Sequence, residues 1–260
     1  MELFYREYGQ GRPFIILHGI FGVSDNWVTF ARKMAKRFHV YIPDQRNHGQ
    51  SPHSSAFNYF ALCSDLYDFI EEHNLDDPII LGHSMGGKVA MRFALENPGM
   101  IKALIVADIS LRAYHRRSKH LDMIDAMKMV DFNEVKSRAD VEKQLQVKIP
   151  EKHIRRFAMK NLYRREYGDQ FAWRLNLEAI NLNMDEVLKG VFSQDIFDKP
   201  ALFVRGGNSD YVKYEDFDRI YRNFPRADIE TIEGASHWLH AEKPSEFYNV
   251  ITTFLNDNEL

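Results

Sequence analysis

The sequence contains a single cysteine, Cys63, among its 260 residues. One thiol cannot form an intrachain disulfide, which fits a protein of a reducing compartment. The first residues lack the basic and apolar segments of a secretion signal. No apolar run approaches the ~20 residues that a membrane-spanning helix needs. These absences predict a cytoplasmic protein without a membrane span.

The chain also lacks a strong charge of either sign, because 34 Lys and Arg nearly balance 37 Asp and Glu. The net charge of −3 gives no reason to expect nucleic acid or an anionic membrane as a partner. No His, Cys and carboxylate cluster has metal-ligand spacing, and the glycines do not follow the P-loop pattern. We therefore expect no metal site and no nucleotide-phosphate cradle.

Short apolar runs alternate with amphipathic segments in the first 110 residues, and the pattern resumes near residue 200. This alternation predicts a mostly parallel sheet with helices on both faces. In such sheets ligands bind beyond the carboxyl ends of the strands. The strands are expected at residues 3–8, 14–17, 40–42, 79–81, 101–106, 202–204 and 228–232.

The segment between residues 111 and 190 has a different pattern. Helical periodicity dominates there and no convincing strand is visible, as in the apolar spacing from Ile154 to Leu162. We predict an inserted helical cap over residues 111–190, with residues 1–110 and 191–260 forming the core. The cap contains more Lys and Arg than Asp and Glu, including Arg112, Arg116, Arg117, Lys119, Lys152, Arg155 and Arg156, and several aromatic residues, including Tyr163, Tyr167 and Trp173.

One pentapeptide, Gly82-x-Ser84-x-Gly86, lies between an expected strand and an expected helix. In this setting the sequence is typical of a nucleophile elbow, a sharp turn that exposes a reactive serine. The flanking glycines allow other backbone segments to approach closely. Ser84 is therefore the candidate nucleophile, and the N–H of Met85 at the helix start is a candidate oxyanion donor.

A serine nucleophile needs a general base, and the base needs an orienting acid. His237 follows the last expected strand and is the candidate base, with His240 as the alternative. Asp108 and Asp210 each follow a neighbouring strand, and both strand ends can approach His237. Topology alone therefore leaves the choice of acid open.

The loop after the strand at residues 14–17 should supply the second oxyanion donor. His18-Gly19 makes a tight turn there, so the next N–H belongs to Ile20, with Phe21 as the alternative. We interpret His18 and His48 as structural hydrogen-bonding residues, and expect His83 to flank the nucleophile.

Six motifs, taken together, resemble the α/β-hydrolase superfamily and, within it, the small YbfF-type esterases of bacteria and their mitochondrial relatives. They are His18-Gly19 with Gly22, Asp44-x-Arg46-Asn47-His48-Gly49-x-Ser51, Gly82-His83-Ser84-Met85-Gly86-Gly87, Asp108-Ile109-Ser110, Gly206-Gly207-Asn208-Ser209 and His237-Trp238-x-His240-Ala241-Glu242-Lys243-Pro244.

The resemblance covers nearly the whole chain and implies an α/β-hydrolase fold. Seven strands are expected rather than eight, because Leu3 leaves no room for the usual first strand. It implies hydrolysis of carboxylic esters or acyl thioesters without a cofactor. We expect short to medium acyl groups, and the basic residues of the cap predict that anionic acyl donors such as acyl-CoA are also accepted. It also implies Asp108 as the acid and Ser209 as a fourth hydrogen-bonding member, whereas Asp210 departs from the pattern and keeps the other arrangement open.

Fold and triad do not fix the substrate. A carbon–carbon hydrolase, a lyase or a cofactor-free perhydrolase is a different chemistry for the same residues. A hydrolase-derived binding protein with little turnover is the non-enzymatic alternative. Serine at position 84 argues against dehalogenase and epoxide-hydrolase chemistry, which use aspartate there.

Overall fold

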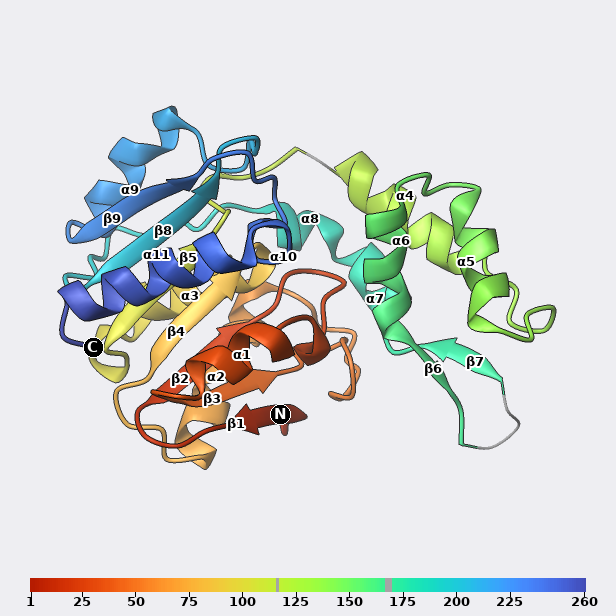
Figure 1. Cartoon of the computed structure of the whole chain (residues 1–260), viewed down its shortest axis with the longest axis horizontal. Coiled ribbons are helices and arrows are strands. Elements are labelled where there is room, and N and C mark those ends of the chain that lie inside the picture. Colours follow the sequence, from red (N-terminus) through yellow and green to blue (C-terminus); the bar gives the residue numbers. More distant parts are fainter. Residues whose placement is uncertain (116, 167–169) are drawn as a thin grey trace.

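The computed structural model describes residues 1–115, 117–166 and 170–260, without the side chains of residues 117–119. Seven strands form one sheet in which β1 is antiparallel to β3 and the other pairs are parallel. This agrees with the predicted mostly parallel sheet (Figure 1). In spatial order the strands are β1 (Tyr5–Tyr8), β3 (His39–Pro43), β2 (Pro13–Leu17), β4 (Ile79–His83), β5 (Ala103–Ala107), β8 (Ala201–Gly206) and β9 (Ala227–Ile232).

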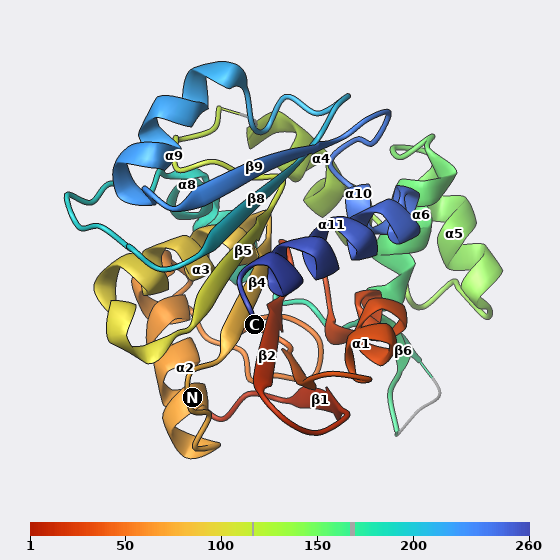
Figure 2. The same ribbon diagram turned by 60° about the vertical axis from the view of Figure 1, so that its left-hand side comes forward.

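Two hydrophobic cores cover the two faces of the sheet. On one face pack α1 (Val28–Met34) and α11 (Pro244–Asp257), and Figure 2 shows α11 crossing in front of the strands. On the other face pack α2 (Tyr59–Glu72), α3 (Met85–Glu96) and α9 (Phe217–Asn223). The central strands are buried on both sides, which explains their uninterrupted apolar sequences.

Short elements complete the core. They are α10 (Leu239–Glu242) and the 3-10 helices η1 (Ser24–Asn26), η2 (Pro98–Met100) and η4 (Tyr214–Asp216). Across the described ranges, no helix is long and apolar enough to cross a bilayer.

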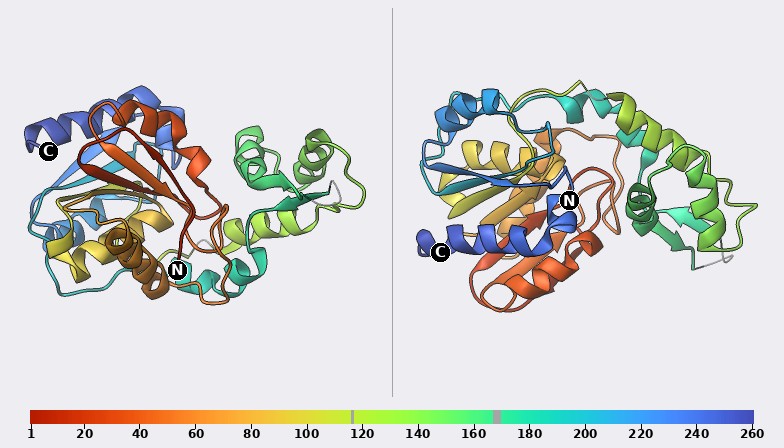
Figure 3. Two further views of the ribbon diagram at one scale, coloured as in Figure 1. Left: turned by 90° about the horizontal axis from the view of Figure 1, so that it is seen from below. Right: turned by 45° about the horizontal axis from the view of Figure 1, so that its top comes forward.

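The segment at residues 111–190 lies to one side of the sheet (Figures 1 and 3). It contains α4 (Arg117–Lys128), α5 (Arg138–Gln146), α6 (Lys152–Ala158), η3 (Met159–Asn161), α7 (Leu177–Leu182) and α8 (Met184–Leu188). Of the cap residues named above, Arg116, Tyr167 and the side chains of Arg117 and Lys119 fall outside the described part of the chain.

The prediction that this segment lacks strands was wrong. β6 (Leu162–Arg164) pairs antiparallel with β7 (Phe171–Trp173) in a hairpin. Each strand has only three residues, too few to show an alternating pattern. Leu162, whose spacing suggested a continuing helix, instead begins β6 after the helix has ended at Ala158. Ile154 and Phe157 do lie in α6 and Met159 lies in η3, so the helical spacing extended by chance to Leu162, one residue beyond η3.

Candidate active site

Ser84 occupies the sharp turn between β4 and α3. Its backbone has φ 53° and ψ −118°, a conformation that L-residues rarely adopt. A side chain on Gly82 would collide with the Gly86 carbonyl, and one on Gly86 would collide with the Leu17 carbonyl. Both glycines are therefore required for the backbone to approach so closely. The turn has the geometry expected of a nucleophile elbow.

Asp108 lies fully buried at the end of β5, and its carboxylate accepts a hydrogen bond from the His237 Nδ1–H at 2.8 Å. The other carboxylate oxygen accepts the Gly206 N–H at 2.9 Å. The Ser209 hydroxyl donates to the same oxygen as His237. These bonds fix the carboxylate and leave Nε2 of His237 available for a second partner.

The other candidate acid, Asp210, lies four residues beyond the end of β8 and is exposed at the rim of the cavity. Its backbone carbonyl accepts a hydrogen bond from Arg112. Of the two carboxylates that sequence topology could not separate, the one bonded to His237 is Asp108.

Two further contacts orient His237. The Tyr211 ring stacks on the imidazole with centroids 3.7 Å apart and an interplanar angle of 14°. Nε2 of His83 bonds to the His237 backbone carbonyl at 2.9 Å. Burial, reinforced by the neighbouring His237, lowers the pKa of His83 to about 3, so His83 is neutral. Tyr211 could not be predicted from the sequence, since nothing local marks an aromatic residue as the partner of a distant histidine.

The two N–H groups proposed for an oxyanion hole, those of Ile20 and Met85, belong to the loop after β2 and the first residue of α3. A helix's first N–H has no intrahelical acceptor. Within the ranges that the structure describes, neither N–H makes a hydrogen bond. The N–H of Phe21, the alternative donor, donates to Nε2 of His48 at 3.2 Å, which favours Ile20 over Phe21.

The side chains of His18 and His48 both hydrogen-bond to the loop after β2. Nε2 of His18 accepts the Gln45 N–H at 3.0 Å, and its Nδ1 bonds to the Gly19 carbonyl. Nδ1 of His48 bonds to the Arg46 carbonyl at 2.9 Å. Each ring accepts with one nitrogen and donates with the other, which only a neutral imidazole can do. Burial lowers the pKa of His18 to about 4 and that of His48 to about 3.

These buried neutral histidines predict acid sensitivity of the fold. Between its folded pKa and the ordinary value of 6.5, such a histidine takes up its proton only on unfolding. Its contribution to the free energy of unfolding is therefore fully present above pH 6.5. This contribution is lost as the pH falls toward the folded pKa, at about 1.4 kcal/mol per pH unit for each histidine. Urea unfolding of the wild type should show the free energy of unfolding falling from pH 6.5 to pH 4.5.

The matched variants are His48→Gln and His53→Gln, the second at an exposed histidine. The His48→Gln slope should be shallower by about 1.4 kcal/mol per pH unit, whereas His53→Gln should keep the wild-type slope. Identical slopes in His48→Gln and wild type would show that His48 does not carry this linkage.

A cavity of about 350 Å³ opens above Ser84 and His237. This is within the usual range for ligand pockets. Its walls include aromatic residues from the core and from the cap, among them Trp27, Phe157 and Trp238. The alternative base, His240, stacks on Trp27 with centroids 4.2 Å apart, and burial holds its pKa well below the ordinary value. Its ring makes no bond to a carboxylate among the described residues.

The same part of the chain contains no group of three His, Cys, Asp or Glu side chains placed to hold a metal ion. The cavity is lined by the Ser84 hydroxyl, by the His237 imidazole bonded to buried Asp108, and by Ile20, and Met85 follows Ser84 directly. Groups of these kinds can act as nucleophile, base and oxyanion donors in acyl transfer.

Comparison with known proteins agrees with this chemistry. Residues 12–244 match the alpha/beta hydrolase fold family. The chain is 38% identical over 247 residues to the mouse sn-1-specific diacylglycerol lipase ABHD11, covering 93% of this chain and 80% of the relative. It is 32% identical to esterase YbfF of Escherichia coli, covering 94% and 93%. A solved structure of a marine microorganism esterase has a TM-score of 0.94 and 41% identity, covering 98% of this chain and 99% of that one.

Proposed function

The chain belongs to the α/β-hydrolase family and is a carboxylic ester hydrolase, and from this premise we propose that it acts as a serine hydrolase through an acyl-enzyme. The observation that carries the proposal is the Asp108–His237 hydrogen bond at 2.8 Å beside the Ser84 elbow.

In the proposed reaction, Nε2 of His237 takes the Ser84 proton as the hydroxyl oxygen attacks the ester carbonyl carbon. The N–H groups of Ile20 and Met85 stabilise the negative charge that develops on the carbonyl oxygen. His237 then gives the proton to the departing alcohol, leaving an acyl-Ser84 ester. Water, activated by the same imidazole, hydrolyses this ester and restores the serine.

Asp108 has the role of orienting acid in this proposal. By accepting the Nδ1–H, it keeps the imidazole in the tautomer whose Nε2 can accept a proton, and it stabilises the imidazolium that forms. Ser209 supports Asp108 as a fourth member by donating to its carboxylate. The deep burial of Asp108 makes each of these bonds stronger than it would be in water.

The proposed substrates are small-molecule carboxylic esters. The related proteins are named for lipase and esterase activity, and a yeast relative, 33% identical over 271 residues, is named a probable alcohol acetyltransferase. We propose that residues 111–190 act as the cap of this site, because α6 contributes His153, Ile154 and Phe157 to the cavity wall.

Acyl thioesters, including acyl-CoA, remain a proposal with narrower support. Two of the basic cap residues are engaged internally: Arg112 pairs with Asp216 at 3.2 Å, and buried Arg155 donates to the carbonyls of Ile149 and Pro150. Lys152 and Arg156 are exposed on α6, the helix that lines the cavity, and among the described side chains of the basic set they are the ones placed to attract an anionic substrate. A cytoplasmic location likewise remains a prediction.

The proposed function is tested by hydrolysis of p-nitrophenyl acetate and p-nitrophenyl butyrate by the wild type and by Ser84→Ala, at equal concentration of folded protein. We expect saturable turnover in the wild type and only background in the variant. If the two proteins release p-nitrophenol at the same rate, the serine mechanism is wrong and a binding role on a hydrolase scaffold is favoured.

A further inference from the structure

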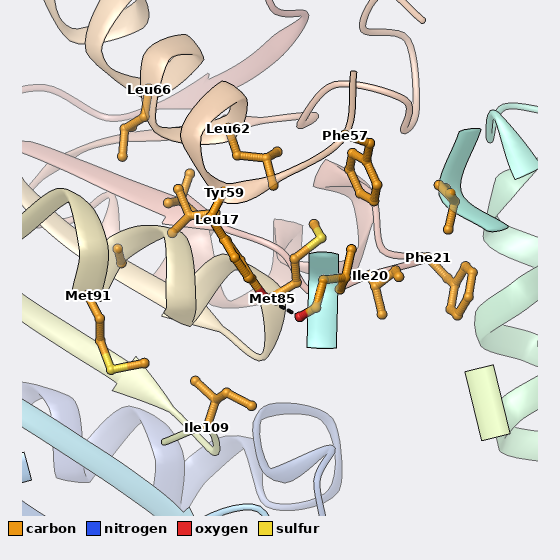
Figure 4. Close-up of a cluster of buried hydrophobic side chains, with 14 of the residues drawn as sticks. Leu17, Ile20, Phe21, Phe57, Tyr59, Leu62, Leu66, Met85, Met91 and Ile109 are labelled. Atoms are coloured by element: carbon orange, nitrogen blue, oxygen red, sulfur yellow. Dashed lines mark hydrogen bonds between the residues drawn. The ribbon is translucent and has the colours of Figure 1, made fainter. Parts of the chain in front are cut away.

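A second, much smaller cavity lies on the other side of Ser84. Its volume is about 20 Å³, little more than one water-sized sphere. It is lined mainly by apolar and aromatic side chains, including Ile20, Tyr59, Met85, Ile109, Val187 and Leu188. Figure 4 shows the Ile20, Tyr59 and Met85 side chains gathered between α2, α3 and the loop after β2, with Ile109 opposite them.

The two cavities share four lining residues, Ile20, Ser84, His120 and Tyr211, but only the larger one reaches the base. His237 lines the 350 Å³ cavity and is not among the residues that line the 20 Å³ one. The departing oxygen must lie within hydrogen-bond reach of the imidazole that protonates it. The alcohol side of the ester therefore belongs in the large cavity.

The acyl side must then leave the reacting carbon in another direction. The small cavity begins at Ser84 and at both candidate oxyanion residues, Ile20 and Met85, so a group bonded to the carbonyl carbon enters it directly. We propose that this cavity is the acyl site and that it confines the acyl group to acetyl size, so that the preferred substrates are acetate esters of larger alcohols. This inference rests on the proposed function and adds to it that the acyl group and the alcohol bind in different cavities.

Hydrogen bonds hold the far wall of the small cavity in place. The Tyr59 hydroxyl donates to the Val187 carbonyl at 2.6 Å, and the Tyr114 N–H donates to the Leu188 carbonyl at 2.9 Å. Buried Lys88 donates to the Lys189 carbonyl and lies 4.7 Å from the centroid of the Tyr114 ring. The end of the cap is thus fastened to α2 and α3 through its backbone, so a longer acyl chain cannot push the wall outward without breaking these bonds.

The direct test uses two isomeric esters, butyl acetate and ethyl butyrate. Both have the same atoms and similar alkoxide leaving groups, and they differ only in which side of the ester carries the longer chain. We expect the wild-type kcat/KM for butyl acetate to exceed that for ethyl butyrate by ~10-fold or more, since one misplaced methylene already changes enzyme selectivity by about that factor.

The matched variants are Val187→Ala and Val191→Ala. Both valines are 6% exposed and lie within five residues of one another, but only Val187 lines the small cavity. The hydrogen bond from Tyr59 goes to the Val187 backbone and survives the change. Val187→Ala should lower the ratio of kcat/KM for butyl acetate to kcat/KM for ethyl butyrate by at least ~3-fold. The reason is faster hydrolysis of ethyl butyrate, because the change removes two methyl groups from the cavity wall. Val191→Ala should leave this ratio at the wild-type value.

Each outcome has a distinct meaning. If the wild type hydrolyses ethyl butyrate as fast as butyl acetate, the small cavity is not the acyl site, while the esterase function stands. An equal fall in the kcat/KM ratio in both variants would also overturn the acyl-site proposal, because the effect would then come from a loosened cap. If neither ester is hydrolysed and p-nitrophenyl acetate is inert as well, the proposed function fails together with this inference.

Discussion

Changing Ser84 to alanine should lower kcat by up to ~10⁶-fold, the loss measured when the serine of a protease triad is removed. The other two serines of the cavity wall, Ser209 and Ser236, donate their hydroxyls to the carboxylates of Asp108 and Glu242. We therefore expect the remaining rate to come from binding and from the oxyanion donors. The backbone strain at φ 53° is common to both residues, and alanine needs no more space than serine. The variant should therefore remain folded, as its thermal unfolding would show.

Ser110→Ala is the matched control for this change. Ser110 is also buried near the end of β5, and its hydroxyl has no hydrogen-bond partner among the described residues. Removing that hydroxyl should leave kcat within a few-fold of wild type. A comparable loss in Ser110→Ala would mean that the region is sensitive to any change, and that the loss in Ser84→Ala does not identify the nucleophile.

The second large effect is expected at the acid. Asp108→Asn should lower kcat by ~10⁴-fold, the cost of the same change in a protease triad. An asparagine amide can present an N–H to Nδ1 of His237, which stabilises the wrong tautomer and removes the negative charge beside the imidazolium. Asp210→Asn should cost ~10-fold at most, through local hydrogen bonds alone.

Asp108 also accepts bonds from Gly206 and Ser209, so a purely structural loss must be separated from a catalytic one. Separate values of kcat and KM, together with the thermal unfolding of each variant, distinguish the two kinds of loss. A positioning role for Asp108 predicts a large fall in kcat with little change in KM. Near-normal turnover in Asp108→Asn together with a large loss in Asp210→Asn would assign the acid to the other loop.

The core of the fold could be predicted because its central strands are buried on both faces. The run from Ile79 to Leu81 and the one from Ala103 to Val106 are apolar without interruption, and only a strand within a covered sheet or a buried helix has that pattern. Their short length and the glycines that follow Leu81 decide in favour of strands. The nucleophile elbow could be recognised for the same reason, since all its signals lie within a few consecutive residues.

The rest of the site depends on contacts between distant residues, and these leave no local pattern. Asp108 and His237 are 129 positions apart, and topology placed two aspartates equally well. Likewise, Tyr211 stacks on His237 because of the path of the loop after β8, and no sequence feature near Tyr211 predicts this contact. Ile20 is favoured over Phe21 as an oxyanion donor because the Phe21 N–H donates to His48, a residue on a different loop. The hairpin β6–β7 was missed because its strands are too short to show a period.

The central claim, that Ser84 is a nucleophile activated by His237, is tested most directly by covalent labelling with a fluorophosphonate, followed by mass spectrometry of the digested protein. The phosphonyl adduct imitates the tetrahedral intermediate, so its formation requires the hydroxyl, the base and the oxyanion donors together. We expect one adduct per chain, on the peptide containing Ser84, and a much slower reaction in Asp108→Asn. An adduct at another residue, or none in protein that is folded, would contradict the assignment of Ser84 as the nucleophile.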